Sequence, residues 1–190
     1  MANEVINFAA DKGTTYGGGL LDAPTTTAAP TDADTALDPA FKPISLIGDS
    51  GLADSVERST DDVRDINGDI VLTVQTEYGV KVTFTILERS LQALKAVYGQ
   101  GNVTETTTTG VTTRVTKYNA EELDHRSYVA QLKGRNGRKL RKYYPDGQIT
   151  EISETTYAKN APSTYEVTMT AYPDENGNCV YDYESFPAVV

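Results

Sequence analysis

Side chains that could carry out catalysis are few and scattered in this sequence. It contains one histidine, His125, which lies between Asp124 and Arg126, and one cysteine, Cys179. Acid–base and nucleophilic catalysis need a base within hydrogen-bond reach of a nucleophile, and neither a Gly-x-Ser-x-Gly motif nor a second cysteine accompanies the histidine. We therefore predict that His125 lies at the surface or at a strand edge, that no residue is catalytic, and that the protein is not an enzyme.

Two short segments alternate acidic and amide side chains, a pattern that could present oxygen atoms to calcium. They span residues 65–69 and 174–178. An EF-hand loop needs Gly at its sixth position and Glu at its twelfth, but counting from Asp65 these positions hold Ile70 and Thr76. The sixth position of the second segment is Cys179, which as a single cysteine also leaves a zinc site short of ligands. We predict tight turns at both places, with no metal and no cofactor.

Basic side chains are concentrated between residues 126 and 142, which contain seven of them and no acidic residue. Tyr128, Tyr143 and Tyr144 lie within or beside this segment. Three interpretations are open: a nucleic-acid interface, a docking surface for acidic segments of the same chain, and a solvated hairpin.

Composition favours a single acidic globular domain. The 190 residues include 17 basic and 27 acidic side chains, which give a net charge of −10 and a pI near 4.5. The excess acid lies in residues 1–88, with 15 acidic and 5 basic residues. Such a balance argues against a protein that grips DNA, which would carry a basic footprint. No run approaches the roughly 20 apolar residues that span a bilayer, and the first residues lack a signal-peptide pattern, so we expect synthesis in the cytosol.

The first half of the chain predicts an arm, a loop and a hairpin. Gly17–Gly19 and three prolines predict an extended N-terminal arm over residues 1–40, with a β domain over residues 41–190. The acidic residues 48–69 predict a long loop. Residues 70–77 and 81–87 alternate with period two, and a three-residue turn at 78–80 would set Val74 opposite Phe84.

The second half predicts one helix followed by antiparallel strands. Ser90 can cap a helix whose Leu91, Leu94 and Tyr98 share a face, and Gly99 marks its end. Strand-like runs follow at residues 126–133, 138–144, 149–157 and 164–172, and turn signals separate them at 136–137, 145–147 and 176–177. The fold class that follows is mainly β with one short flanking α-helix.

Segments distributed over nearly the whole chain resemble the major tail proteins, or tail tube proteins, of long-tailed siphophages, particularly those that infect actinobacteria. The resemblance rests on these segments: DAPTTTAAPTDADTALDPAFK (22–42), GDSGLADSVERSTDDVRDINGD (48–69), LKAVYGQGNVT (94–104), YYPDGQITEISETTY (143–157) and YEVTMTAYPDENGN (165–178). It implies a β-sandwich or split β-barrel subunit that forms stacked hexameric rings, whose strands join in a ring-shaped inner β-barrel around the channel for DNA ejection. The alternative is a Thr-rich β-sandwich adhesion or surface-binding module.

The resemblance also implies partners and a location. The partners would be other copies of the chain, the tape measure protein, the tail terminator and tail-tip proteins, with DNA passing through the lumen without specific binding and no membrane. The protein would reside in the virion tail, and in the host cytoplasm during assembly.

If the chain is a tube subunit, roles can be predicted for its polar surfaces. The hairpin face expected to line the lumen comprises Thr73, Gln75, Glu77, Lys81, Thr83 and Thr85. The acidic loop, with Asp49, Asp54, Glu57, Asp61, Asp62 and Asp65, is expected to contact a neighbouring subunit. Its expected partner is the basic hairpin, with Lys133, Arg135, Arg138, Lys139, Arg141 and Lys142. Complementary patches of this kind can form a heterologous contact, the type that propagates an assembly.

Overall fold

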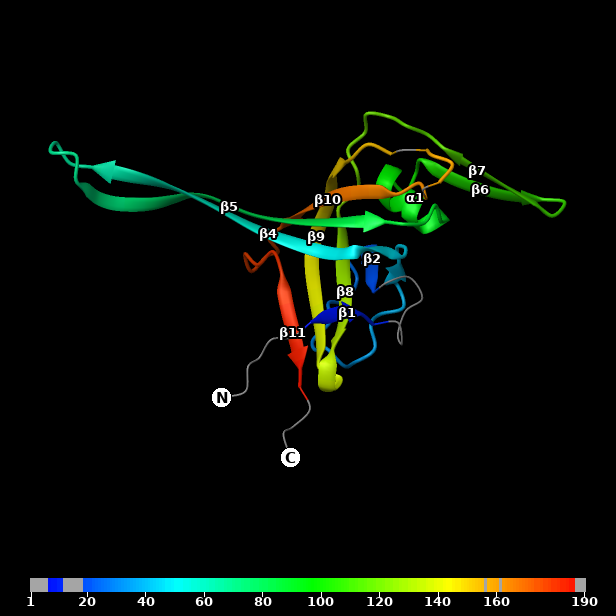
Figure 1. Ribbon diagram of the computed structural model, residues 1–190, viewed down its shortest axis with the longest axis horizontal. Helices are drawn as coiled ribbons and strands as arrows, with labels where there is room; N and C mark the ends of the chain where they lie inside the picture. Colours follow the sequence, from blue (N-terminus) through cyan, green and yellow to red (C-terminus); the bar gives the residue numbers. More distant parts are fainter. Residues whose placement is uncertain (1–6, 12–18, 156, 161, 187–190) are drawn as a thin grey trace.

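The computed structural model describes residues 7–11, 19–155, 157–160 and 162–186 (Figure 1). The strands are β1 (Phe8–Ala10), β2 (Leu20–Pro24), β3 (Lys42–Pro43), β4 (Ile47–Arg64), β5 (Ile70–Ile86), β6 (Val103–Thr108), β7 (Val111–Thr116), β8 (Arg126–Gly134), β9 (Lys139–Ile152), β10 (Tyr165–Tyr172) and β11 (Tyr181–Ser185). The described part also contains α1 (Leu91–Tyr98) and a short 3-10 helix, η1 (Arg135–Gly137).

Nine strands form one antiparallel sheet in the order β3-β2-β8-β9-β10-β5-β4, with β1 added beside β8 and β11 beside β9. The other two strands, β6 and β7, form a separate hairpin. This confirms the mainly β fold class with one short flanking helix. The arrangement is broadly sandwich-like, and the described strands of one chain do not close into a barrel.

Strand β9 pairs with different strands along its length and carries a bulge that bends it. Its first half lies beside β11 and its second half beside β10. The bend falls at residues 145–147, where a turn was predicted; that prediction is wrong, because the segment forms a bulge within one strand. Ser127 Oγ donates to the Pro145 carbonyl at 2.6 Å. Gly147 is required here because a Cβ would lie 2.9 Å from both Met169 Sδ and Tyr128 Cδ2.

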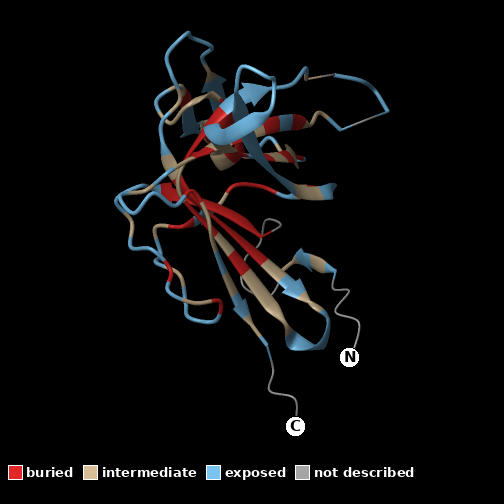
Figure 2. Cartoon of the chain, turned by 90° about the vertical axis from the view of Figure 1, so that its left-hand side faces the viewer, coloured by how far each residue is buried: buried red, intermediate tan, exposed pale blue. Residues whose placement is uncertain are grey.

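Two hydrophobic clusters lie on opposite faces of the sheet, since adjacent strand residues such as Tyr143 and Tyr144 are divided between them. The larger one contains Phe84, Tyr144, Tyr165 and Met169, and the smaller one is built around Phe41 and Tyr143. Figure 2 shows the buried residues gathered where the strands cross, while the hairpin ends are exposed.

Helix α1 forms as predicted and covers the larger cluster. The Ser90 hydroxyl accepts the Ala93 N–H at 3.1 Å, and Gly99, at φ 98°, ends the helix. Leu94 and Val97 are buried against the sheet.

The acidic segment is a strand for most of its length, so the prediction of a loop over residues 48–69 is wrong. Strand β4 pairs with β5 as a long hairpin, and β5 continues through residues 78–80 without a turn. Val74 therefore lies opposite Asp61 instead of Phe84. The turn lies at residues 65–69, where Asp65 Oδ1 accepts the N–H groups of Asn67 and Asp69. The Asp65 carboxylate thus satisfies backbone N–H groups of the turn, and the exposed hairpin leaves its other carboxylates in contact with solvent.

The predicted boundary at residue 40 is also wrong within the described residues. Strand β2 lies between β3 and β8 in the main sheet, and Leu20, Leu21 and Ala23 are buried. Residues 1–6 and 12–18 of the predicted arm lie outside the described part. The β domain therefore begins before residue 40, because Leu20 and Leu21 of the N-terminal segment supply core side chains.

Candidate functional site

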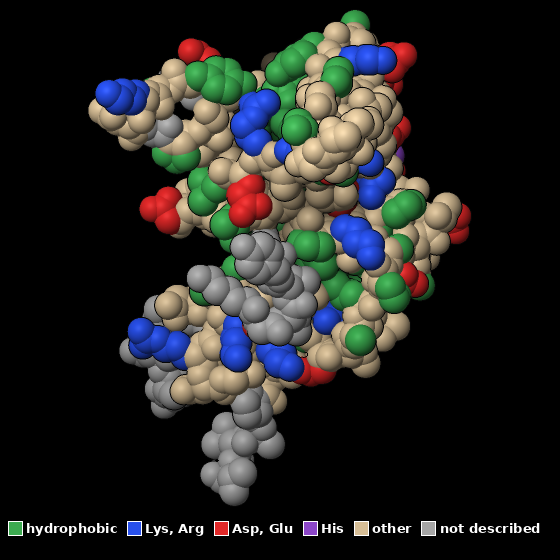
Figure 3. All heavy atoms as spheres, turned by 90° about the vertical axis from the view of Figure 1, so that its right-hand side faces the viewer, with side chains coloured by type: hydrophobic (Ala, Val, Ile, Leu, Met, Phe, Trp, Pro, Cys, Tyr) green, Lys and Arg blue, Asp and Glu red, His purple; other side chains and the backbone are tan. Residues whose placement is uncertain are grey.

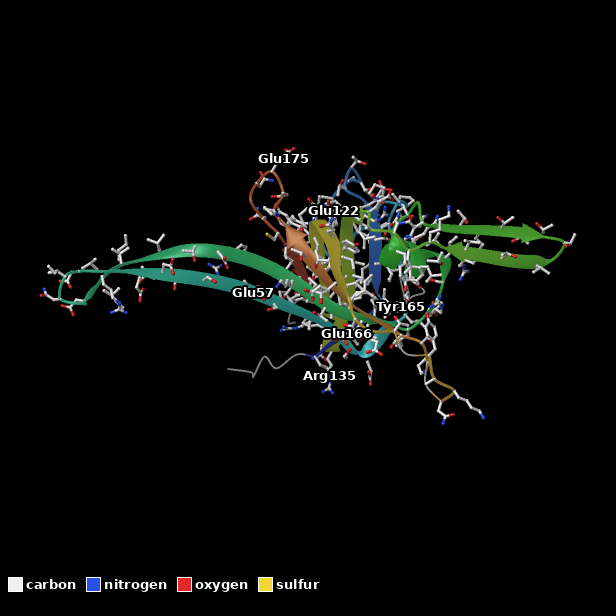
Figure 4. The ribbon with its side chains drawn as sticks, turned by 90° about the horizontal axis from the view of Figure 1, so that it is seen from above. Glu57, Glu122, Arg135, Tyr165, Glu166 and Glu175 are labelled. Carbon is white, nitrogen blue, oxygen red and sulfur yellow. The ribbon has the colours of Figure 1, made fainter. Side chains whose placement is uncertain are left out.

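Two hairpins project from opposite sides of the body (Figures 1 and 4). The longer one is β4–β5; β10 pairs with β5 only along residues 80–86, so in the described structure residues 70–79 pair with β4 alone. The shorter one, β6–β7, closes at Thr109 and Gly110, both with positive φ. A two-stranded ribbon is marginally stable in water, and open strand edges are templates for pairing with another chain. Both hairpins are therefore candidate assembly elements.

A β-bulge at Thr76 divides the long hairpin into two parts. Ser59 pairs with Glu77 and Thr60 with Gln75, which leaves Thr76 without an opposite residue on β4. Alternation of the β5 side chains is therefore shifted by one position across the bulge.

Cross-strand contacts show the shift directly. On one face Ser59 Oγ donates to Glu77 Oε2 at 3.3 Å, and Lys81 Nζ lies 3.3 Å from Glu57 Oε2. On the other face Arg58 stacks over the Tyr78 ring and donates to Gln75 Oε1 at 3.2 Å.

The six residues predicted to line the lumen therefore do not share one face. Glu77, Lys81, Thr83 and Thr85 lie on the face opposite the buried Val82 and Phe84. Thr73 and Gln75 lie on the other face, and the Thr73 hydroxyl donates to Asp62 Oδ1 at 2.8 Å. The prediction assumed a turn at 78–80 and uninterrupted alternation before and after it.

Beyond the bulge, the Glu77 face becomes apolar. Val63 lies directly opposite Leu72, and Val74 is two residues along the same strand. These three side chains, here named the apolar stripe, are 44–56% exposed. Figure 4 shows Glu57 partway along the hairpin, between the body and this outer part. The described chain leaves the stripe uncovered.

The base of the long hairpin is fixed to the body through Asp54. Its carboxylate accepts the Tyr144 hydroxyl at 2.9 Å and lies 2.9 Å from Lys142 Nζ, which also lies 2.8 Å from Asp182. Burial lowers the pKa of Lys142, but its hydrogen bonds to Asp182 and Asp54 outweigh burial and leave the pKa raised. An ammonium held between two carboxylates thus sets where the hairpin leaves the body.

Three of the six basic residues, Lys139, Arg141 and Lys142, contact acidic segments of the same chain. This agrees with the second of the three interpretations that the sequence left open, a docking surface within the chain. Besides Lys142, Lys139 Nζ lies 2.7 Å from Asp34 Oδ1. The buried Arg141 donates to the Asp32 carbonyl at 2.6 Å and the Thr35 carbonyl at 2.9 Å. Burial lowers the pKa of Arg141.

The other three basic residues lie near the turn between β8 and β9. Lys133 and Arg135 are exposed, and Arg138 lies over the Phe186 ring at 4.6 Å. Sequence reasoning grouped six residues whose burial and partners differ, because charge alone does not distinguish a buried guanidinium from an exposed one.

The acidic residues of the long hairpin also have several local roles. Besides Asp54, Glu57 pairs with Lys81, Asp62 lies 3.7 Å from Arg64, and Asp65 caps the turn. Asp49 and Asp61 are exposed. Hydrogen bonds from the backbone, first that of Asp69, lower the pKa of Asp65.

His125 lies at the surface, as predicted, with Nδ1 2.7 Å from Asp146 Oδ1. The second acidic segment forms the predicted turn, in which Asp174 Oδ1 accepts the N–H groups of Asn176 and Asn178. Within the described ranges, no three His, Cys, Asp or Glu side chains gather where they could hold a metal ion. No described helix has the length and apolar character needed to cross a membrane.

Comparison with known proteins identifies the family. A sequence model described as "Phage tail tube protein" matches residues 13–183. Among solved structures, the chain is similar to the tube-terminating cap of the anti-feeding prophage, determined by cryo-EM, with a TM-score of 0.46 and 9% sequence identity over 97% of this chain and 100% of that one. A search of curated proteins finds no match. Because the family match spans most of the sequence, the chain belongs to the phage tail tube protein family.

Proposed function

We propose that this protein is the repeating subunit of a siphophage tail tube, assembling into hexameric rings that stack around a channel for DNA ejection. Family membership gives the structural, virion-tail role. The observation that supports the finer proposal is the long hairpin, whose outer part pairs with no other described strand of its own chain. Edges of this kind are satisfied when neighbouring copies close the strands into a ring.

The lumen-facing set in this proposal stops at the bulge. It keeps Glu77, Lys81, Thr83 and Thr85, gains Glu57 from β4, and excludes Thr73 and Gln75. Two carboxylates against one ammonium make this surface slightly acidic, and such a wall would not capture DNA through counterion release. DNA would therefore pass without specific binding.

Charge pairing between subunits remains part of the proposal for the exposed residues at the two surfaces. These are Asp49 on the acidic side and Lys133 and Arg135 on the basic side. Exposed pairs contribute only about 0.2–1 kcal/mol each, so apolar contacts and strand pairing would supply most of the affinity. The tape measure protein, the tail terminator and tail-tip proteins would be further partners. Assembly would take place in the host cytoplasm.

Negative-stain electron microscopy of the concentrated protein tests assembly. We expect rings or tubes with sixfold class averages, whereas dispersed monomers at every concentration would contradict the proposal.

The lumen assignment is tested in tubes of Thr83→Cys and Thr73→Cys variants that also carry Cys179→Ala. A small maleimide should label Thr83→Cys, and a maleimide on a carrier too large for the channel should not. Labelling of Thr83→Cys by the large reagent would show that this face lies outside.

A further inference from the structure

The short hairpin presents one face without any charge. Register pairs Thr104 with Val115, Thr106 with Thr113, and Thr108 with Val111. All six residues are exposed and β-branched, and we name their surface the charge-free face. In a chain with 44 charged side chains this is a distinct surface. Figure 3 looks from the side on which this hairpin projects, and its upper part shows tan and green surface bordered by charged side chains.

The opposite face of the same hairpin satisfies its polar groups locally. Arg114 lies 2.5 Å from Glu105 Oε2, and the hydroxyls of Thr107 and Thr112 are 2.9 Å apart. Arg114 also donates to the Arg89 carbonyl, which ties this face to the body. The charge-free face is therefore the one directed away from the chain's own contacts.

The apolar stripe of the long hairpin needs a partner that brings no charge with it. A charged side chain placed over Val63 or Leu72 would be desolvated without compensation, whereas Asp61, opposite Val74, stays at the solvated rim of the contact. The methyl groups of the charge-free face carry no such cost, and their hydroxyls can keep hydrogen bonds to water or backbone at the rim.

Direction and symmetry determine which copies can meet. The two hairpins leave opposite sides of the body, so the stripe cannot reach the charge-free face of its own chain (Figures 1 and 4). A stripe-to-stripe contact would close a pair of subunits and stop growth. It would also bring together two copies of Asp61, whose side chain lies beside Val74 on the stripe's own face. A stripe-to-charge-free-face contact avoids both problems and can propagate.

We propose that the apolar stripe of one subunit, Val63, Leu72 and Val74, docks on the charge-free face of β6–β7 of a second copy. This inference rests on the proposed tube function and adds the specific pair of surfaces that would join its subunits. The β-bulge at Thr76 is the element that turns the stripe to the face opposite the chain's own core side chains, so that a neighbour covers it.

Disulfide cross-linking between two single-cysteine variants tests the contact. Leu72→Cys and Thr106→Cys, each with Cys179→Ala, are mixed before assembly, and the tubes are treated with a mild oxidant. Cysteines join only when their Cα atoms lie within about 7 Å. Thr73→Cys, on the opposite face of the long hairpin, replaces Leu72→Cys in the matched control. All changed hairpin positions are exposed, and equal unfolding temperatures would verify that the variants fold.

The expected result is a cross-linked dimer on a non-reducing gel at least tenfold more abundant for Leu72→Cys with Thr106→Cys than for the control. A dimer formed by Leu72→Cys alone would show stripe-to-stripe contact and overturn the proposal. Intact tubes without cross-linking would also overturn the proposal. In that case another surface or another tail protein covers the stripe, and the proposed tube function still stands. A parent protein that forms no rings or tubes would overturn both proposals.

Discussion

Replacing Arg141 with Met should destabilise the isolated subunit, because Arg141 is a buried clamp within the chain. Its guanidinium fixes the segment before β3 through the carbonyls of Asp32 and Thr35. A role in subunit contacts alone would instead leave the isolated subunit unchanged and affect only assembly. The substitution thus separates two roles for the basic hairpin.

The size of the effect follows from the contacts. Two hydrogen bonds from a charged donor contribute about 1.5–3 kcal/mol each. Burying the guanidinium costs desolvation free energy, and part of that cost is uncompensated because Arg141 Nε has no hydrogen-bond partner within the described structure. Substitution with Met removes this cost, which offsets part of the loss. We therefore expect a net loss of about 2–4 kcal/mol in the free energy of unfolding. At about 2–4 °C per kcal/mol for a chain of this size, the melting temperature should fall by roughly 4–16 °C.

Thermal and urea unfolding of the monomer, at a concentration below assembly, measures this loss. The matched control is the same substitution at the exposed Arg135, which should change the free energy of unfolding by less than about 0.5 kcal/mol. If Arg141→Met has the same melting temperature and free energy of unfolding as the parent but slower tube assembly, the Arg141 clamp does not stabilise the isolated subunit. Equal losses for both variants would also contradict the reasoning, since burial would then have no influence.

Two further predictions follow from the close approach at β9 and from the capped turns. Gly147→Ala should lower the free energy of unfolding by about 1–3 kcal/mol, because its Cβ would overlap the buried Tyr128 ring; Gly79→Ala, with open space around it, is the control in the same urea titration. Hydrogen bonds, first from the Tyr181 hydroxyl, hold the pKa of Asp174 below its ordinary 3.8. Stability from this carboxylate is therefore present above pH 3.8 and lost as the pH falls through the lower folded value. Urea unfolding between pH 5 and pH 2 should show a smaller loss for Asp174→Asn than for the parent, and identical profiles would contradict the assignment.

Local signals in the sequence were sufficient for the helix and for several turns. Ser90 and Gly99 cap α1 as predicted, since the capping hydrogen bonds depend on neighbouring residues alone. The turns after Asp65 and Asp174 also follow from local side-chain chemistry. Alternating apolar residues identified β5, and the family resemblance supplied the class of structure.

The pairing of distant segments was not available from local patterns. Local patterns predict turns at residues 78–80 and 145–147, but the strands continue through both because their partner strands are distant in the sequence. A bulge adds one residue to one strand, and the sequence around Thr76 carries no mark of it because either alternation is compatible with its polar side chains. Thr73 and Gln75 therefore do not share a face with the other four residues predicted to line the lumen.

Acidic residues along the long hairpin have a physical role besides any contact with a basic surface. Strand β4 is an 18-residue edge strand, and an exposed edge of that length with an apolar stripe would pair with other copies in any register. Residues 48–69 carry seven carboxylates and two guanidinium groups, so hairpins of different subunits repel one another when they approach side by side. A charge-free docking surface adds nothing to that repulsion. The same charge that opposes random edge pairing therefore leaves the proposed contact between the apolar stripe and the charge-free face as the favoured way for two copies to meet.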